Sequence, residues 1–410
     1  MFEFTEEQKM AQRMLRMWCK KELEPLVPAM EKGELLPFDT MRKLGETFGL
    51  RGIVEARFAR LEEKAKAASA SGTTAGEAED KGAFGDAGML AVLVIELSRL
   101  SPGFAMSFGA WLGLTGGAIM AKGTYAQKVR WGKPLLSMEK IGAWAITEPQ
   151  SGSDAFSGMR TMARRDGDHY VLNGQKTFIT NAPFADTFVV YAKLDVEEEK
   201  RPIEERPIHA FVLEKGTPGL AVSKPMEKMG MHTSPTGEVF LADARVPKDQ
   251  LLGETEASQS REGARDVFHS ERTGIAPMAL GIIERCLEDS VRYAKERKTW
   301  GRAIAEYQLT QEKLARMFVH RENVRNMVFR ELWAAKTKTK IPMAEACACK
   351  LYAARAATEV AMEAVQLMGG NGYMREFCVE QLARDAKLLQ IGGGTDEIQI
   401  VTIARELLRE

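Results

Sequence analysis

The hydrophobic pattern of this chain changes its period twice. From Thr5 to about Gly132, apolar residues recur every three to four positions, which is the spacing of one face of a helix. From about Lys140 to Gly253 the pattern alternates with period two, in short runs separated by Gly- and Pro-containing turns. The helical spacing returns from Glu262 to the end. A chain of 410 residues is also too long for one compact core, so several domains are expected.

These changes of period predict an α+β protein with three regions. We expect an N-terminal all-α domain at 1–139, a middle β-barrel domain at 140–253 and a C-terminal four-helix bundle at 254–410. One stretch stands apart, because segment 56–85 contains few residues that a core could bury. Its composition is typical of a flexible surface insertion, and a short charged helix is an alternative for its start.

Charge and composition disfavour several classes of partner. Lys+Arg and Asp+Glu both number 57 and no basic tract stands out, so nucleic acid and anionic membrane are poor partners. No segment approaches the length of a membrane span by inspection, and the acidic N-terminus is neither a secretory signal nor an Arg-rich transit peptide. We therefore expect a cytoplasmic protein without a membrane span.

The five cysteines are scattered and show no metal-binding spacing. No C-x-x-C pair occurs, and Cys347 and Cys349 lie two residues apart in a helical pattern, where they do not face a common ligand. No cluster of His and carboxylates has metal-ligand spacing either. Small buried thiols and no metal site are the expectation.

Two compact motifs in the β region place polar groups at the ends of apolar strands. They are Ala145–Asp154 (AITEPQSGSD) and Asn173–Asn181 (NGQKTFITN). Strand ends with hydroxyls, amides and free backbone donors can seat a flat heteroaromatic ring and hold its polar edge. Either motif alone is a weak signal, because a plain β-edge with turn residues has the same composition. Together they favour a cofactor site.

With these motifs the sequence resembles the acyl-CoA dehydrogenase family, whose flavin lies across the two strands. The family also has the α, β, α order of regions, and only segment 56–85 falls outside the resemblance. The resemblance implies FAD as cofactor and α,β-dehydrogenation of an acyl-CoA thioester as the reaction. The positions that it implies at the cofactor are Trp144, Ile146, Thr147, Ser153, Phe178, Ile179 and Thr180, of which Ser153 also holds the CoA part of the substrate.

A second group of residues matches the family's site for the adenine-diphosphate half of the cofactor. These residues are Arg297, Thr299, Gln308, Gln366, Gly369 and Gly370, with Thr395 as a further cofactor-binding position. Taken singly, Arg297 is explained equally well as a charge at a helix C-terminus, and Gly369-Gly370 as a helix stop. In the family this half-site serves the cofactor of a neighbouring subunit. The resemblance therefore also implies a homotetramer, a dimer of dimers.

The residue that removes the substrate's α-proton is missing from the position that many family members use. That position is Gly393 here, and glycine cannot accept a proton. A subset of the family, including isovaleryl- and long-chain acyl-CoA dehydrogenases, carries its catalytic Glu on an earlier helix, immediately before an Arg. Glu271 and Arg272 match this pair, which implies Glu271 as the catalytic base. In an arbitrary protein Glu271 would be a solvated acid in a first helical turn. The substrate-binding positions implied are Ser153, Arg272, Gly393 and Gly394.

The identity of the acyl chain is left open. The apolar stretch Phe104–Thr115 should line the acyl pocket and contains no charge for a second carboxylate, which favours a branched or aryl-bearing chain. A dicarboxylic monothioester such as benzylsuccinyl-CoA would need a cation from another loop. By resemblance, the electrons pass to an electron-transferring flavoprotein. Two alternatives stay open: an acyl-CoA oxidase that reduces oxygen, and a non-catalytic flavin-binding assembly factor.

Overall fold

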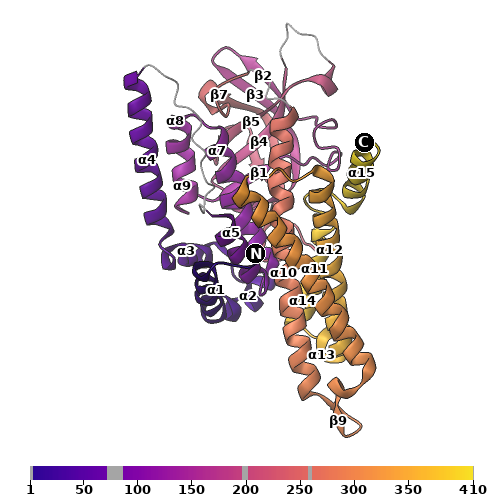
Figure 1. Ribbon diagram of the computed structural model, residues 1–410. Helices are drawn as coiled ribbons and strands as arrows, with labels where there is room; N and C mark the ends of the chain where they lie inside the picture. The colour runs from indigo at the N-terminus through magenta and orange to yellow at the C-terminus, as the bar shows by residue number, and fades with distance from the viewer. Residues whose placement is uncertain (1–2, 72–85, 196–201, 257–260, 410) are drawn as a thin grey trace.

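The computed structural model describes residues 3–71, 86–195, 202–256 and 261–409, and the side chains of 68–71 and 261–273 lie outside that description. Helices fill the first third of the chain, a curled sheet follows, and long helices run to the C-terminus (Figure 1). The sheet lies at one end of the molecule and the C-terminal helices extend away from it. The α, β, α order that the change of period predicts is confirmed. The boundaries at 139/140 and 253/254 stay predictions.

The N-terminal region consists of helices, several of which continue into one another through π-helical turns. Thr5 starts the first helix with a capping box to Gln8. The Ser101 hydroxyl caps the helix that begins at Pro102, accepting the Phe104 N–H at 3.2 Å. The elements are α1 Glu6–Trp18, η1 Cys19–Leu23, η2 Glu24–Leu26, α2 Val27–Glu31, α3 Phe38–Thr47, α4 Leu50–Ser71, α5 Ala87–Ser98, α6 Pro102–Phe108, η3 Gly109–Gly116, α7 Gly117–Lys122, α8 Tyr125–Gln127, η4 Lys128–Gly132 and α9 Lys133–Leu136.

The elements α6, η3 and α7 form one continuous apolar helix, Pro102–Lys122. It is long and apolar enough to cross a membrane, so the expectation that no segment approaches that length is wrong. However, 67% of its apolar window is buried inside the protein, and η3 packs against the first strand of the sheet. Such burial is usual for the core helix of a globular fold.

The expected insertion at 56–85 begins inside a long helix. α4 continues through Ser71, so the charged helix considered for the start of this segment extends through about half of it. Glu62 and Lys66 form an ion pair of 2.6 Å across one turn of that helix, which supports the helical conformation. Residues 72–85 lie outside the described part of the chain.

Seven strands form one curled sheet in the order β1-β4-β2-β3-β7-β6, and β5 pairs with β4. The strands are β1 Gly142–Ala145, β2 Met162–Asp166, β3 His169–Thr180, β4 Thr187–Asp195, β5 Ile208–Glu214, β6 Leu220–Val222 and β7 Thr236–Pro247. All residues of β4 except the last are buried, as expected for a strand paired on both edges and covered on both faces.

β1 and β2 pair with successive parts of the same edge of β4. β1 runs parallel to residues 187–190, and β2 runs parallel to residues 193–195. The chain between them, which we call the 146–161 loop, therefore leaves this edge of the sheet and returns to it. Most of the first sequence motif lies in this loop.

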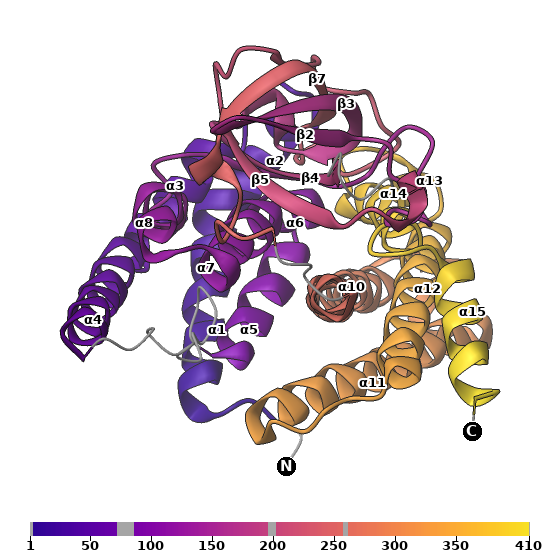
Figure 2. The same ribbon diagram turned by 90° about the horizontal axis from the view of Figure 1, so that it is seen from above.

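The C-terminal region is a bundle of long helices. Its elements are α10 Arg261–Glu296, β8 Lys298–Thr299, β9 Arg302–Ala303, α11 Gln308–Thr337, α12 Met343–Met368, α13 Gly370–Tyr373, α14 Cys378–Leu389 and α15 Asp396–Leu407. Seen from above, α10 lies between the N-terminal helices and α11 and α12 (Figure 2), and it contacts α5, α11 and α12. One continuous set of buried apolar side chains runs through all three regions, from Leu15 to Leu389. The three regions are therefore packed into one body.

Candidate active site

The ends of β1 and β3 lie side by side, which brings the two motifs together. The Thr177 N–H donates to the Thr147 carbonyl at 2.9 Å, two residues beyond the end of β1. Ile146 and Ile179 are buried, whereas Thr147 and Thr180 are half-buried. The positions predicted for the flavin ring on the two motifs therefore share one edge of the sheet.

Phe178 projects from this strand end. It lies in a β-bulge, because the pairing of β3 with β7 shifts between Lys176 and Ile179. Its backbone has φ = 56°, a left-handed conformation that is rare for a bulky residue. Its side chain is 68% exposed, although Ile179 beside it is buried. The bulge presents a flat apolar ring where the resemblance implies a ring that covers the cofactor.

Trp144 and Ser153, the other predicted positions of the first motif, are in different environments. The Trp144 indole is buried, donates from Nε1 to the Tyr191 hydroxyl at 3.3 Å, and meets the Tyr191 ring edge to face at 5.3 Å. Burial raises the pKa of Tyr191 to about 12, so this phenol stays protonated. Ser153 lies on the 146–161 loop and is exposed. Trp144 thus packs in the core, whereas Ser153 is exposed and can contact a ligand.

A buried ion pair that was not predicted lies beneath the strand ends. The Lys176 Nζ is 2.8 Å from the Glu148 carboxylate and donates to the Ile146 carbonyl at 3.1 Å, and the two charged side chains are 0% and 2% exposed. Burial lowers the pKa of Lys176 to about 8 against the effect of Glu148. Burial also acts to raise the pKa of Glu148, but Lys176 and several hydrogen bonds outweigh it and lower that pKa.

The sequence contained a signal for this pair. Tyr170 and Leu172 are inward positions of β3, and Lys176 keeps the same parity in the alternation. A lysine at an inward strand position requires a buried counter-charge. Glu148, the carboxylate of the neighbouring motif, supplies it.

The residues predicted for the diphosphate half of the cofactor lie at the far tip of the bundle. The first stretch holds Arg297, Thr299 and Gln308, and the second holds Gln366, Gly369 and Gly370. The Asn371 Nδ2 donates to the Tyr293 hydroxyl at 3.1 Å, which ties α13 to the last turn of α10. The two stretches are therefore neighbours, as predicted.

The predicted site residues of the C-terminal region divide between the two ends of α12. The Gly394 carbonyl accepts a hydrogen bond of 2.7 Å from Lys350 near the start of α12, whereas Gly369 follows its last residue. Eighteen helical residues lie between Lys350 and Gly369, so the two are roughly 28 Å apart along the helix. α15, which follows Gly394, lies beside the sheet end of the bundle (Figure 1). The two groups of predicted cofactor residues are therefore far apart within one chain.

The Gly392–Gly394 turn is firmly held. Gln399 Nε2 donates to the carbonyls of Gly393 and Gly394 at 3.2 and 2.9 Å, in addition to the bond from Lys350. Gly393 and Gly394 have φ of 64° and 86°, which favour glycine. The Thr395 hydroxyl then caps α15. The position where many family members carry their base is therefore a fixed backbone turn without a side chain.

Glu271 and Arg272 fall in the part of α10 whose side chains lie outside the described residues. Their backbone is helical, one turn before the buried Ile275. Their assignment as base and substrate contact stays a prediction.

The strand-end site fits a flat cofactor with a polar edge. It combines the exposed Phe178 ring with the half-buried hydroxyl residues Thr147 and Thr180. Apolar surface with a few fixed polar groups is what an isoalloxazine ring requires. Within the described ranges, no group of three or more His, Cys, Asp or Glu is placed to hold a metal ion. None of the five cysteines forms a disulfide, and every one except Cys378 is buried, which confirms the expectation for those four thiols.

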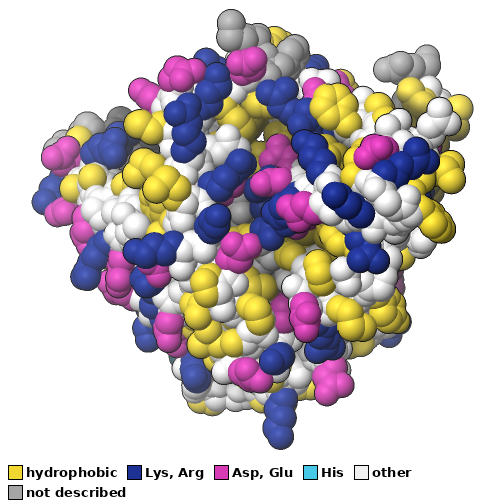
Figure 3. Space-filling model, turned by 90° about the horizontal axis from the view of Figure 1, so that it is seen from below, with side chains coloured by type: hydrophobic (Ala, Val, Ile, Leu, Met, Phe, Trp, Pro, Cys, Tyr) yellow, Lys and Arg dark blue, Asp and Glu magenta, His cyan; other side chains and the backbone are white. Residues whose placement is uncertain are grey.

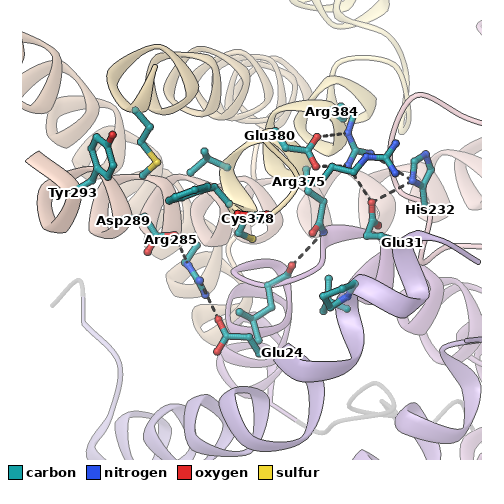
Figure 4. Close-up of a pocket in the computed structure, with 18 of the residues that line it drawn as sticks. Glu24, Glu31, His232, Arg285, Asp289, Tyr293, Arg375, Cys378, Glu380 and Arg384 are labelled. Carbon is teal, nitrogen blue, oxygen red and sulfur yellow. Dashed lines mark hydrogen bonds and ion pairs between the residues drawn. The ribbon is translucent and has the colours of Figure 1, made fainter. Parts of the chain in front are cut away.

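A charged cavity of about 710 Å³ lies away from the strand ends, between α2, α10 and α14 (Figure 4). Arg285 is 3.0 Å from Glu24 and 2.7 Å from Asp289, and Arg384 is 3.2 Å from Glu31 and 2.8 Å from Glu380. Both arginines are thus already paired with carboxylates. Basic and acidic side chains also intermingle across the face shown in Figure 3.

Asp385, on α14 beside this cavity, joins the bundle to the sheet domain. Its buried carboxylate accepts the Met231 N–H and a 3.4 Å hydrogen bond from Gln381. Burial, followed by the nearby Glu31 carboxylate, raises the pKa of Asp385 to about 7. This junction therefore titrates close to neutral pH.

The chain is similar to known proteins along its whole length. Residues 143–244 match the family model for the acyl-CoA dehydrogenase middle domain, and residues 262–408 match the model for the acyl-CoA dehydrogenase C-terminal domain. The chain is 36% identical to a probable acyl-CoA dehydrogenase, YngJ, of Bacillus subtilis, with 100% of both chains covered. It is 32% identical to a 3-(aryl)acrylate reductase of Clostridium sporogenes, covering 99% of this chain and 100% of that protein.

Solved structures agree with the sequence comparisons. A chain from the structure described as the electron transferring flavoprotein of Acidaminococcus fermentans aligns with a TM-score of 0.85 at 34% identity, covering 100% of both chains. An acyl-CoA dehydrogenase of Bacillus anthracis complexed with FAD aligns with a TM-score of 0.81 at 30% identity, covering 99% of this chain and 68% of that one. The present chain belongs to the acyl-CoA dehydrogenase family.

Proposed function

We propose that this protein removes hydrogen from the α and β carbons of an acyl-CoA thioester to give the 2-enoyl-CoA. The chain is an acyl-CoA dehydrogenase, an oxidoreductase, and FAD is its cofactor. The bound flavin supplies the acceptor for the β-hydrogen as hydride. The observation that carries the proposal is the strand-end site, where Phe178 stands exposed on a bulge beside Thr147 and Thr180.

Different residues of the strand ends contact different parts of this cofactor. Phe178 covers the ring, and the buried Ile146 and Ile179 keep water from the strands beneath it. Thr147, Thr180 and the backbone donors around them hold the polar edge, where a reduced ring gains electron density. Ser153, exposed on the 146–161 loop, binds the CoA part of the substrate.

We assign the α-proton to Glu271. A carboxylate in a dry pocket has a raised pKa and is a stronger base than one in water. The absence of a side chain at Gly393 supports this assignment, because the turn there is fixed by Lys350 and Gln399 and offers no other proton acceptor of its own. It would place the chain in the subset of the family with isovaleryl- and long-chain-type base positions.

We favour a branched or aryl-bearing acyl chain as substrate. Gly109, Gly113 and Gly117 share one face of the Pro102–Lys122 helix, and a Cβ at any of them would meet no described atom within 4 Å. This face has room beside it for a bulky group. The 32% identity to a 3-(aryl)acrylate reductase points in the same direction. A benzylsuccinyl-CoA-like substrate would in addition need a cation at its free carboxylate.

We further propose an electron-transferring flavoprotein as electron acceptor, a homotetramer as the assembly and a cytoplasmic location. The likeness to a chain in an electron transferring flavoprotein structure supports the acceptor. The division of predicted cofactor residues between the two ends of α12 supports an assembly in which neighbouring chains complete each site.

A panel of acyl-CoA thioesters tests the reaction. Purified holoenzyme is mixed anaerobically with straight, branched, aromatic and dicarboxylic thioesters, and bleaching of the flavin absorbance is recorded. Rapid bleaching by branched or aromatic members is expected. No bleaching by any member, at full FAD occupancy, would contradict the proposal and favour the assembly-factor alternative.

Hydrogen peroxide distinguishes the dehydrogenase from an acyl-CoA oxidase. Turnover without added acceptor should release little peroxide, whereas stoichiometric peroxide would identify an oxidase.

A further inference from the structure

We propose that the buried Glu148–Lys176 pair positions the flavin-binding strand ends. The inference rests on the proposed function, because it concerns the cofactor site assigned there. The pair touches neither cofactor nor substrate in this assignment. It acts through Ile146, Thr147 and the 146–161 loop.

Lys176 makes a hydrogen bond to the backbone immediately beyond the end of β1. β1 ends at Ala145, so the Ile146 carbonyl has left the strand ladder. Lys176 Nζ donates to that carbonyl at 3.1 Å, and the next residue of β3, Thr177, donates its N–H to the Thr147 carbonyl at 2.9 Å. Two consecutive carbonyls of the proposed flavin contact are thereby fixed by two consecutive residues of β3.

Glu148 closes the loop that carries Ser153. Its carboxylate accepts the Arg160 N–H at 2.6 Å and the Thr161 N–H at 2.9 Å, together with the Thr161 hydroxyl and Lys176. The loop therefore starts and ends on one buried, fully hydrogen-bonded carboxylate. A buried ion pair with all its hydrogen bonds made has little freedom, because either charge left alone would be costly.

Lys193 offers a matched comparison. It is also a lysine with 0% exposure, on β4, which is separated from β3 by β2, and its Nζ donates to the Ser157 carbonyl at 2.9 Å. It thus reaches the same loop at Ser157 and not at Ile146 or Thr147. If buried lysines serve only the stability of this domain, replacing either should have the same consequences.

The experiment compares Glu148→Gln/Lys176→Met with Lys193→Met. The double variant removes both charges, keeps an oxygen that can accept the Arg160 and Thr161 N–H groups, and releases the Ile146 carbonyl. The melting temperature of each apo-protein reports stability. FAD titration of apo-protein, followed by flavin fluorescence, and the absorption spectrum of bound flavin report the geometry of the site.

We expect the double variant to raise the Kd for FAD by about tenfold or more and to shift the flavin spectrum, with Lys193→Met within about twofold of the unmodified protein. Equal Kd values and unshifted spectra in the two variants would overturn the inference. If the double variant does not fold, Glu148→Gln/Lys176→Gln replaces it, because two neutral amides leave neither buried charge unpaired. That variant should still raise the Kd by at least about threefold more than Lys193→Met, and equality would again overturn the inference. Failure of the unmodified apo-protein to bind FAD would instead contradict the proposed function.

Discussion

The sheet side and the helical side of the proposed active site are built in opposite ways. On the sheet side, the buried charges of Glu148 and Lys176 are paired with each other, and the exposed ring of Phe178 is held on a bulge. On the helical side, the usual base position is a glycine turn, and one helix face carries glycines beside open space. Under the proposed function, the sheet positions the cofactor, while the helices supply the residue that removes the α-proton and select the acyl chain.

The largest effect should come from Glu271→Gln, which separates the two sides. The variant should bind FAD normally but lose about 100- to 10,000-fold of the rate of flavin bleaching, because the amide cannot accept the α-proton. Single-turnover stopped-flow absorbance measures that rate. Glu397→Gln, at the first turn of α15, is the matched control and should bleach normally. Rapid bleaching by Glu271→Gln would show that Glu271 is not the catalytic base.

Adding Gly393→Glu to Glu271→Gln should restore part of the lost rate. A carboxylate would return to the position that many family members use. The recovery should be incomplete, since a glutamate at φ = 64° costs on the order of 1 kcal/mol of backbone strain. Single-turnover bleaching of the double variant against Glu271→Gln tests this. No recovery in a folded, FAD-loaded double variant would show that the Gly393 turn does not face the reacting carbon.

The next effect tests whether the bundle tip serves a neighbouring chain. Arg297→Ala should weaken FAD binding by about tenfold, because a charge-assisted contact to a diphosphate is lost. Co-expression of Arg297→Ala with Glu271→Gln chains should then regain activity at limiting FAD. Each mixed pair would contain one site with both residues intact.

Activity of the co-expressed chains equal to the average of the two parent variants would contradict shared sites. Size-exclusion chromatography with light scattering supplies the control that mixed oligomers have formed.

A smaller effect should appear when the open helix face is filled. Gly113→Leu is expected to lower kcat/KM for aryl-bearing thioesters by about tenfold or more, with less effect on short straight chains. Gly52→Leu, another helical glycine without described neighbours within 4 Å, is the control and should leave the ratio unchanged. An equal loss on all thioesters would mean that this face does not select the acyl chain.

The smallest effect concerns the junction of the two sides at Asp385. Its folded pKa of about 7 lies above the ordinary value of 3.8, so the stabilisation from its protonated form is complete below the unfolded pKa and is lost as pH rises through about 7. Asp385→Asn should therefore reduce the fall in melting temperature between pH 5 and pH 8, by roughly 1–3 °C.

The titration at this junction also depends on the charges around it, which are Glu31, Lys228 and Arg384. The half-exposed Asp166, changed to Asn, is the control and should leave the pH dependence of the melting temperature as it is. A slope unchanged in Asp385→Asn would show that another group governs the pH response.

Much of this arrangement was accessible from the sequence, because hydrophobic period predicts elements well. This period predicts the strands, whereas the closeness of the two stretches now found at the bundle tip follows from the resemblance to the family. The bulge at Phe178 was not predicted, since it arises from the pairing of β3 with β7, a contact between distant segments. The Glu148–Lys176 pair was missed for a different reason. Charged residues are usually exposed, so the sequence pattern does not by itself show that Lys176 occupies an inward position of β3 and is buried with Glu148.

Composition alone underpredicts the length of α4, because its small and charged residues are also common in loops, although Ala, Glu and Lys all favour helix. The length of the apolar helix Pro102–Lys122 is not evident from the sequence, because its glycines and single polar residues lower the apparent hydrophobicity of the stretch.

The pairing of β1 and β2 with one edge of β4 has a consequence for how such a protein can change over evolution. Each strand finds its register on β4 independently, so residues between Pro149 and Met159 can be added, removed or exchanged without moving either strand. The buried carboxylate of Glu148, at the start of this segment, accepts hydrogen bonds from the backbone at its end. A new recognition surface for the thioester could therefore arise here by insertion or deletion, while the cofactor keeps its place.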